Sequence, residues 1–447
     1  MIQKPKGTYD VIDGKDILYI EELIKALMEK YNYEYFRTPL FEASELFHRG
    51  VGETSDIVTK ETYDFTDRGN RSMTLRPEGT AGIVRSFIEN KLYGSHTMPV
   101  KTWYYGPMYR YERPQSGRFR EFYQFGVEVF GSDEPMIDAE VISIPVNLYK
   151  LLGLKGIKVN INSLGDNASR LKYKEALKEY FQPFLKDLCE DCQMRFEKNP
   201  LRILDCKIDH DKDIMKNAPK TIDYLNEVSK NHFEKVKEYL EILAIPYTVN
   251  PNIVRGLDYY THTVFEVEAS VEGFGSQNVL CGGGRYDNLV ESLNGPATSG
   301  VGFALGLERL LNALELEKIK LNKNNGIDVY IVPMTLEENK FALNLCLTLR
   351  LNGFKTDIDY MSRNLKSNFK QADKLDAKFV IIIGQDEIES NVLTIKNNHT
   401  KEEAKIDADY VMMYLDEQLE NTECEDDCHC EDDCHCEDDC HCEDCED

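Results

Sequence analysis

The sequence predicts an α+β domain built on an antiparallel sheet, with a helical insertion, a smaller C-terminal α/β domain and a disordered acidic Cys/His tail. Two strand-like runs flank a Pro/Gly loop within residues 103–131, which is the pattern of an antiparallel hairpin with a long tip. From residue 328 onward strands and helices alternate, as in a mainly parallel sheet covered by helices. Residues 424–442 repeat cysteine, histidine and acidic residues, a composition that argues for disorder.

Size and composition place the chain among globular proteins of two to four domains, since it has 447 residues. No run approaches the roughly 18 apolar residues typical of a membrane span. The first residues contain no apolar signal core, so we expect a soluble cytoplasmic protein.

The formal net charge of −26 is unevenly distributed. Residues 423–447 hold fourteen acidic residues and no basic one, and the remaining chain has 65 acidic against 53 basic residues. Polyanion binding needs only a local basic surface, so the net charge does not exclude a nucleic-acid partner. Eight of the 13 cysteines also lie in the tail, and the five others suggest reduced thiols instead of a disulfide framework.

Residues 16–31 have apolar side chains at helical spacing and predict an amphipathic helix. The extended run that follows is interrupted by Pro39, which suits a strand edge or an interface strand. The alternative is an ordinary helix–strand pair inside a monomer. Two further strand-like runs flank a turn at residues 67–70, and the second leads into a helix. Glu78 and Thr80 stand at that helix start, where a carboxylate favours the helix dipole.

The hairpin within residues 103–131 is rich in arginine, whose planar fork of donors grips phosphate or carboxylate at two points. Four arginines lie in it, and its second run carries two polar residues: Arg110, Arg113, Arg118 and Arg120, then Gln124 and Glu128. This pattern favours a holder for a polyanion. The alternative is a solvated arginine-rich hairpin.

A helix at 138–152 and a strand with a turn at 158–166 precede a mostly helical, charged stretch over residues 169–245, which we interpret as an insertion. It contains Cys189-x-x-Cys192, Cys206 and His210. Two cysteines at this spacing can begin a zinc site. Structural or free thiols are the alternative, and the wide separation of the other two residues favours it.

Residues 252–266 predict a turn followed by a strand, and residues 281–287 predict a glycine-rich turn. Glycine there permits close approach of a ligand or another backbone. Residues 300–311 predict a strand that leads into a helix near Gly306, with Arg309 in its first turn. Taken alone, Arg309 is an ordinary surface arginine on a core helix.

A Lys/Asn-rich linker at residues 318–325 precedes the C-terminal βαβα pattern. Lys366, Lys370 and Lys374 repeat every four residues and therefore share one helix face. Such a row is usually a solvated face, and it also suits an RNA backbone. In the tail, thiols and imidazoles suit zinc or copper(I), and the alternative is a merely solubilising tail. The tail candidates for a metal are Cys428, His429, Cys430, Cys434, His435 and Cys436.

The hairpin sequence GPMYRYERPQSGRFREFYQFGVEVFG resembles motif 2 of the class II aminoacyl-tRNA synthetases and, in detail, the histidyl-tRNA synthetase family. The runs RGLDYYTHTVFEV and GGGRYD match the signature that separates this family from other class II enzymes, with Thr261-His262 where many relatives carry Asn-Arg. The N-terminal helix and Pro39 strand resemble motif 1, and residues 300–311 resemble motif 3. The resemblance covers nearly residues 1–418, and the tail lies outside it.

The resemblance implies a class II synthetase fold and ATP-dependent activation of L-histidine to histidyl-adenylate, followed by transfer to the 3′ end of tRNA(His). ATP is then a substrate with Mg²⁺, and the implied partners are tRNA(His) and a second copy of the chain. The expected division is a catalytic domain at 1–168 and 246–317, the insertion at 169–245, an anticodon-binding domain at 326–418 and the tail at 419–447.

The resemblance also implies roles for individual residues. Arg110 and Arg255 would neutralise the reacting carboxylate and α-phosphate, while Arg118 and Arg309 would bind the ATP phosphates. Glu78 and Thr80 would hold the α-ammonium of histidine. Gln124 would help to place the amino acid and the nucleotide. Glu128, and Tyr260 with Tyr259 beside it, would meet the two ring nitrogens of histidine. Gln115 and Arg120 would contact the acceptor end of the tRNA.

Two other functions stay open. A catalytically silent paralogue of these enzymes regulates the first enzyme of histidine biosynthesis, but it lacks the anticodon domain and typically loses the signature. This chain retains Arg255, Arg309 and the C-terminal βαβα pattern. Alternatively, the tail makes the chain mainly a metal-handling protein.

Overall fold

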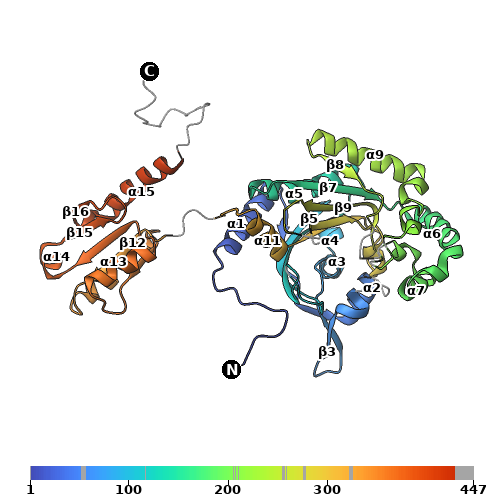
Figure 1. Ribbon diagram of the computed structural model, residues 1–447. Coiled ribbons are helices and arrows are strands. Elements are labelled where there is room, and N and C mark those ends of the chain that lie inside the picture. The colour runs from blue at the N-terminus through green and yellow to red at the C-terminus, as the bar shows by residue number, and fades with distance from the viewer. Residues whose placement is uncertain are drawn as a thin grey trace, which may run out of the picture. The chain divides into compact units, whose positions relative to one another are not determined.

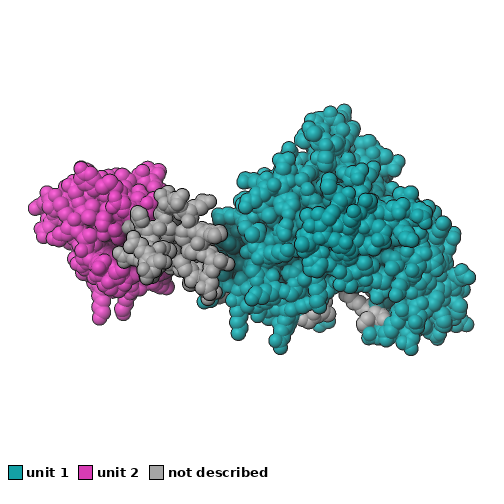
Figure 2. Space-filling view, turned by 90° about the horizontal axis from the view of Figure 1, so that it is seen from above, with its two compact units in different colours: residues 1–321 teal, residues 322–447 magenta. Residues whose placement is uncertain are grey.

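A computed structural model describes residues 2–51, 57–115, 117–204, 206, 208–209, 211–253, 257, 259–274, 278–321 and 326–427, with backbone only for Val51 and residues 421–427. The chain divides into two compact units, residues 1–321 and 322–447, which Figure 2 shows in different colours. Each unit is described by itself.

The first unit is organised around an eight-stranded sheet (Figure 1). Both terminal pairings, β1 with β5 and β7 with β8, are parallel, and all the pairings between them are antiparallel. This confirms the predicted α+β fold on an antiparallel sheet. In spatial order the strands are β1 (Glu34–Tyr35), β5 (Val100–Tyr109), β6 (Glu121–Phe130), β11 (Gly300–Gly306), β10 (Val279–Arg285), β9 (Thr261–Ala269), β7 (Ile157–Ser163) and β8 (Tyr247–Val249).

The predicted hairpin is formed by β5 and β6, which pair antiparallel from Val100–Phe130 to Tyr109–Glu121. The predicted turn at 67–70 joins β3 (Tyr63–Thr66) and β4 (Ser72–Leu75), which form a three-stranded sheet with β2 (Phe41–Ala43). The helices of the first unit are α1 (Lys15–Lys30), α2 (Ser44–Val51), α3 (Thr80–Glu89), α4 (Leu92–Ser95), α5 (Pro135–Leu151), α6 (Asn167–Phe181), α7 (Glu190–Lys198), α8 (Asp213–Lys216), α9 (Glu227–Ile242), α10 (Leu289–Ser292) and α11 (Leu307–Leu316).

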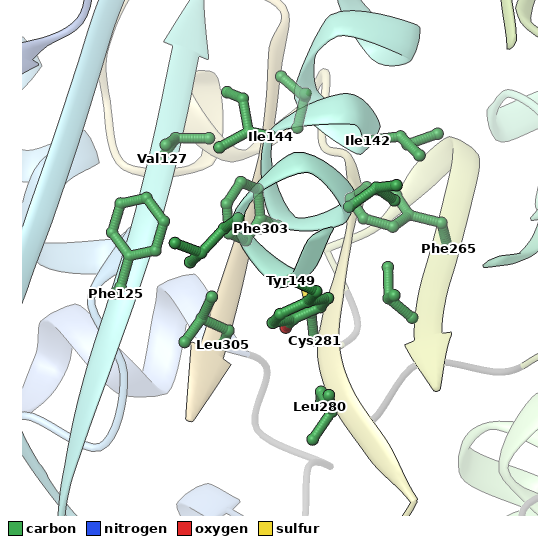
Figure 3. Packing of buried hydrophobic residues seen from close by; sticks show 14 of the residues in the cluster. Phe125, Val127, Ile142, Ile144, Tyr149, Phe265, Leu280, Cys281, Phe303 and Leu305 are labelled. Carbon is green, nitrogen blue, oxygen red and sulfur yellow. The ribbon is translucent and has the colours of Figure 1, made fainter. Parts of the chain in front are cut away.

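The two faces of the large sheet differ because successive side chains of a strand point to opposite sides. One face is covered by α5, whose Ile142, Ile144 and Tyr149 pack with strand residues in a buried cluster (Figure 3). The strands contribute Phe125 and Val127 of β6, Phe265 of β9 and Phe303 and Leu305 of β11. The alternate positions, which we call the site face, are Gln124, Gly126 and Glu128 of β6 and Gly302, Ala304 and Gly306 of β11.

The prediction of a glycine-rich turn at residues 281–287 was wrong in its geometry. These residues belong largely to β10, a central strand that pairs with both β9 and β11. The glycines serve the close approach that was predicted, because a Cβ at Gly283 would lie 2.3 Å from the backbone oxygen of Gly302. Consecutive glycines hide the alternation that marks a strand, since they have no side chains to show it.

The helical insertion has a small core of its own, in which ten of the described side chains are buried, including Tyr173, Phe181 and Phe196. Between α6 and α9 its elements are short, as α7 has nine residues and α8 has four. This segment therefore has little apolar surface to bury, a point that matters below.

The second unit is a five-stranded sheet of order β13-β12-β14-β15-β16, in which β12 to β14 are parallel and the last two strands antiparallel. Its core contains Ile331, Ile381 and Leu393. The row of Lys366, Lys370 and Lys374 is exposed. The elements are β12 (Val329–Pro333), α12 (Asn339–Leu351), β13 (Thr356–Ile358), α13 (Leu365–Lys374), β14 (Phe379–Ile383), α14 (Gln385–Ser390), β15 (Val392–Asn397), β16 (Glu403–Asp407) and α15 (Val411–Asp427).

Helix α15 reaches Asp427, beyond the expected start of the tail at residue 419. The tail candidates from Cys428 to Cys436 lie outside the described residues. Within the described part of the chain, no helix combines the length and apolar character needed to cross a membrane.

Candidate active site

A cavity of about 460 Å³ lies over the site face of the large sheet. Its walls come from the hairpin, the start of α3, the turn before β9 and the start of α11. Nine predicted site residues line it, from segments far apart in the sequence: Glu78, Thr80, Arg110, Arg118, Gln124, Glu128, Tyr259, Tyr260 and Arg309. The order of strands in the sheet brings these residues together, because β6 and β11 are neighbours and place the hairpin beside the helix that carries Arg309.

Glu128 lies at the floor of the cavity and is only 1% exposed. Thr80 donates its hydroxyl to one carboxylate oxygen at 2.6 Å, and Tyr286 donates its hydroxyl to the other. Gly302 lies opposite on β11, where a Cβ would come within 2.0 Å of the same carboxylate. Glycine at that position therefore makes the space in which Glu128 lies.

Burial raises the pKa of Glu128 to about 8, even though hydrogen bonds from Thr80 and Tyr286 favour the charged form. An unfolded chain releases this proton near pH 4.5, so between about pH 4.5 and 8 the unfolded state binds fewer protons than the folded state. The contribution of Glu128 to stability is therefore greatest at low pH and falls as the pH rises through this window.

We expect a Glu128→Gln variant, which cannot titrate, to gain stability relative to the wild type as the pH rises. Because one proton is involved, the difference in the free energy of unfolding should change by at most about 1.4 kcal/mol per pH unit. Denaturation of both proteins at pH 5.5, 6.5 and 7.5 measures it, and the comparison cancels the titration of other groups. A difference that does not change with pH would contradict the assignment.

Glu78 stands between β4 and α3 and is also buried. Its carboxylate accepts the backbone N–H of Ala81 at 2.7 Å and of Thr80 at 3.2 Å, so part of its role is to cap the helix start. The Tyr259 hydroxyl lies 3.5 Å away. Burial raises the pKa of Glu78, although these hydrogen bonds and Arg110 oppose the shift. A buried carboxylate at a cavity wall is a suitable partner for an ammonium group.

Each cavity arginine has a contact that orients its guanidinium group. Arg110 donates from Nε to the carbonyl of Pro77 at 2.8 Å and lies 5.3 Å from the ring of Phe122. Arg118 forms an ion pair with the buried Glu112. Arg309, in the first turn of α11, donates to the carbonyl of Val279 at 2.9 Å. Three guanidinium groups thus line one cavity, as binding of a polyanion requires.

The remaining predicted residues lie elsewhere. Gln115 lines a smaller cavity of about 340 Å³ that shares Glu112 and Arg118 with the larger one. Arg120 is not in either wall: its guanidinium lies 3.8 Å from the ring centroid of Tyr111, and its Nε donates to the carbonyl of Glu112. Arg255 lies outside the described residues. Its place relative to the cavity therefore stays a prediction.

Tyr286 and Glu308 also belong to the site, although the sequence did not identify them. Tyr286 contacts Glu128, and its place in the GGGRYD run was the only signal. Glu308 lines the cavity beside Arg309, and it accepts the Tyr9 hydroxyl at 2.7 Å and the Tyr123 amide at 2.8 Å. It therefore ties the N-terminal segment and β6 to the start of α11. Nothing in its local sequence indicates that role.

Comparisons with known proteins indicate the same family for both units of the chain. A family model described as histidyl-tRNA synthetase matches residues 14–310, and one described as an anticodon binding domain matches residues 328–418. A histidine–tRNA ligase of Geobacillus is 52% identical over 419 residues, which are 93% of this chain and 99% of that protein. One from Staphylococcus aureus is 50% identical over 418 residues, 93% of this chain and 100% of that protein.

Among solved structures, the crystal structure of apo S. aureus histidyl-tRNA synthetase has a TM-score of 0.80 and 45% identity, and it covers 93% of this chain and 100% of that one. A histidyl-tRNA synthetase from Nostoc, at 21% identity, has a TM-score of 0.66 and covers 94% and 100%, respectively. The second likeness shows that the fold extends to distant sequences.

Proposed function

The chain belongs to the histidyl-tRNA synthetase family, and from this premise we infer how its cavity performs the ligation of histidine to tRNA. In the first step, a carboxylate oxygen of histidine attacks the α-phosphate of ATP, the bond to the β-phosphate oxygen breaks and pyrophosphate leaves. In the second, a ribose hydroxyl of the terminal adenosine of tRNA(His) attacks the histidyl-adenylate and AMP leaves. The observation that supports this assignment is that three arginines meet Glu78 and Glu128, both buried, in one cavity.

The first step brings two anions together, so cations must neutralise both and stabilise the charge that develops in the transition state. Arg110 is assigned to the carboxylate and the α-phosphate, and Arg118 and Arg309 to the other phosphates of MgATP. Their common cavity supports these roles. Arg255 is assigned as a second cation at the α-phosphate on the resemblance alone. No general base is needed, because the carboxylate of histidine is already ionised.

Selection of histidine requires partners for both ring nitrogens, since a site built on hydrogen bonds rejects analogues that leave its groups unpaired. Glu128 is assigned to one nitrogen, and Tyr260 beside Tyr259 to the other. Glu78 with Thr80 is assigned to the α-ammonium. Gln124 is assigned to the placement of both substrates. Its Oε1 is buried and has no hydrogen-bond partner within the part of the chain that the structure describes, which suits an acceptor for a substrate N–H.

Several assignments beyond the cavity complete the proposal. Gln115 and Arg120 on the hairpin tip are assigned to the acceptor end of tRNA(His), and the exposed lysine row of α13 to its anticodon region. The proposal includes the domain division given above: a catalytic domain at 1–168 and 246–317, an insertion at 169–245, an anticodon-binding domain at 326–418 and a tail at 419–447. A homodimer is proposed because apolar side chains of the motif 1 region, Tyr35, Leu40 and Phe41, are exposed. Cytoplasmic location is proposed because the tRNA partner is there.

Pyrophosphate exchange with each of the twenty amino acids tests the activation step directly. The expected result is ATP–pyrophosphate exchange that depends on histidine and is absent with the other nineteen. Exchange with another amino acid in preference to histidine would overturn the assigned pocket, and absence of any exchange would favour a catalytically silent paralogue.

Removal of the tail separates the synthetase from the metal-handling alternative. A chain that ends at Asp427 keeps Leu419, which packs against the core of the second unit. We expect it to aminoacylate tRNA(His) at the wild-type rate, because the cavity and the C-terminal sheet belong to the residues before the truncation. A large loss of activity would instead give residues 428–447 a part in the reaction.

A further inference from the structure

Three cysteines and one aspartate meet inside the helical insertion, away from the residues assigned to the cavity. Cys189 precedes α7 and Cys192 lies in its first turn, while Cys206 and Asp209 follow a short helical turn at Pro200–Ile203. One ligand atom from each of the four residues lies within 4.8 Å of the others. Cys192 and Asp209 are fully buried, Cys206 is nearly so, and Cys189 is half-buried.

The distances fit a tetrahedral ion. Zinc bonds of about 2.3 Å to sulfur place tetrahedral sulfur ligands about 3.8 Å apart. The Sγ atoms of Cys189 and Cys206 lie 3.6 Å apart, and Cys206 Sγ lies 3.8 Å from Asp209 Oδ2. Both separations are close to that spacing, and all four ligand atoms lie within 4.8 Å of one another.

Hydrogen bonds around the cluster orient the same four groups. The amide of Cys189 donates to Asp209 Oδ2 at 2.9 Å, and the amide of Asp209 donates to the sulfur of Cys206 at 3.4 Å. Lys212 lies 2.7 Å from the other carboxylate oxygen of Asp209. Donors of this kind fix ligands in place and offset negative charge around a metal.

We propose that Cys189, Cys192, Cys206 and Asp209 form a structural zinc site in the insertion. The sequence had suggested His210 as the fourth ligand; His210 lies outside the described residues, and Asp209 is the group that the structure places with the thiols. All four positions are filled by protein groups, which is typical of structural zinc and not of catalytic zinc.

The ligand set favours zinc over other occupants. Iron–sulfur clusters are normally held by four cysteines, and copper(I) prefers soft ligands to a carboxylate. A disulfide would use two of the thiols and leave the third thiol and the carboxylate without a purpose. A structural ion also suits the place, because the elements between α6 and α9 are short and the described residues there form a small core.

The test compares zinc content among full-length proteins, so that any zinc on the tail contributes equally to each. After dialysis against Zn²⁺ at low concentration, a Cys192→Ser/Cys206→Ser variant should bind one zinc per chain fewer than the wild type, measured by inductively coupled plasma mass spectrometry. With Co²⁺ as the probe, the difference between the two absorption spectra should show thiolate charge-transfer bands and the strong visible bands of tetrahedral cobalt.

Two further variants keep the proposal falsifiable if the double variant fails to fold. Cys346→Ser changes a buried thiol in the second unit and should keep the wild-type zinc count. Asp209→Cys should also keep it, because a fourth thiolate replaces the carboxylate. Equal zinc in the wild type and the double variant, or loss of one zinc from Asp209→Cys, would overturn the site. So would a disulfide among the three cysteines in protein purified without an oxidant.

Discussion

Replacing Arg110 with alanine is expected to lower the rate of histidine-dependent pyrophosphate exchange by about 10²–10³-fold, the usual cost of removing one preorganised group that stabilises transition-state charge. Arg110 lines the cavity from the end of β5, where its contact with the Pro77 carbonyl aims the guanidinium. The carboxylate and α-phosphate repel each other most strongly as they approach, so the loss should appear mainly in kcat. Steady-state exchange with varied histidine and ATP measures it.

Two matched variants define what the result means. Arg110→Lys keeps the charge but loses the planar fork, and it should give an intermediate loss. Arg71→Ala removes a guanidinium from the same unit whose side chain is 79% exposed and paired with Asp67 in the turn between β3 and β4. Its exchange rate should match the wild type. If Arg110→Ala exchanges within threefold of the wild type, Arg110 does not clamp the reacting groups.

A single methyl group at Gly302 is expected to damage both the site and the fold. The added Cβ would lie 2.0 Å from a carboxylate oxygen of Glu128 and 2.3 Å from the backbone oxygen of Val127. The second of these is backbone of the neighbouring strand and cannot rotate away. Overpacking of this kind costs about 1–3 kcal/mol or more. We therefore expect Gly302→Ala to unfold at a lower temperature and to lose most histidine-dependent exchange through a raised KM for histidine.

Gly94→Ala provides the control, because a Cβ at Gly94 in α4 would meet no heavy atom within 4 Å. An open position of this kind tolerates alanine with a change within about 0.5 kcal/mol. Thermal unfolding and the exchange assay on both variants give the comparison. Gly302→Ala protein with wild-type stability and KM would show that the Glu128 carboxylate does not lie against Gly302.

The parts of the fold that the sequence predicted are those with a local signal. The period of the α1 residues, the Pro/Gly tip of the β5–β6 hairpin and the alternation from Val329 onward need no knowledge of distant contacts. The strand β10 was not predicted, because its glycines have no side chains that could show the alternation typical of a strand. The short strand β16 and helix α14 also had no pattern that separated them from loops.

The resemblance to a known family identified the candidate site residues, and the structure shows which of them line one cavity. Arg309 had no signal of its own and joins the cavity only because β11 lies beside β6. Glu308 and Asp209 were not predicted, because each contacts a partner that is distant in the sequence. Glu308 binds Tyr9, and Asp209 binds the amide of Cys189. Local sequence cannot report contacts that depend on the order of strands or the path of an insertion.

If separate segments of the chain form one cavity that holds histidine beside ATP, a crystal structure with a non-hydrolysable histidyl-adenylate analogue will show both substrate parts in that cavity. We expect the imidazole between Glu128 and Tyr260, the ammonium at Glu78 and the phosphate mimic within hydrogen-bond distance of Arg110. An analogue bound with its ring away from Glu128, or outside this cavity, would rule out the assigned histidine pocket.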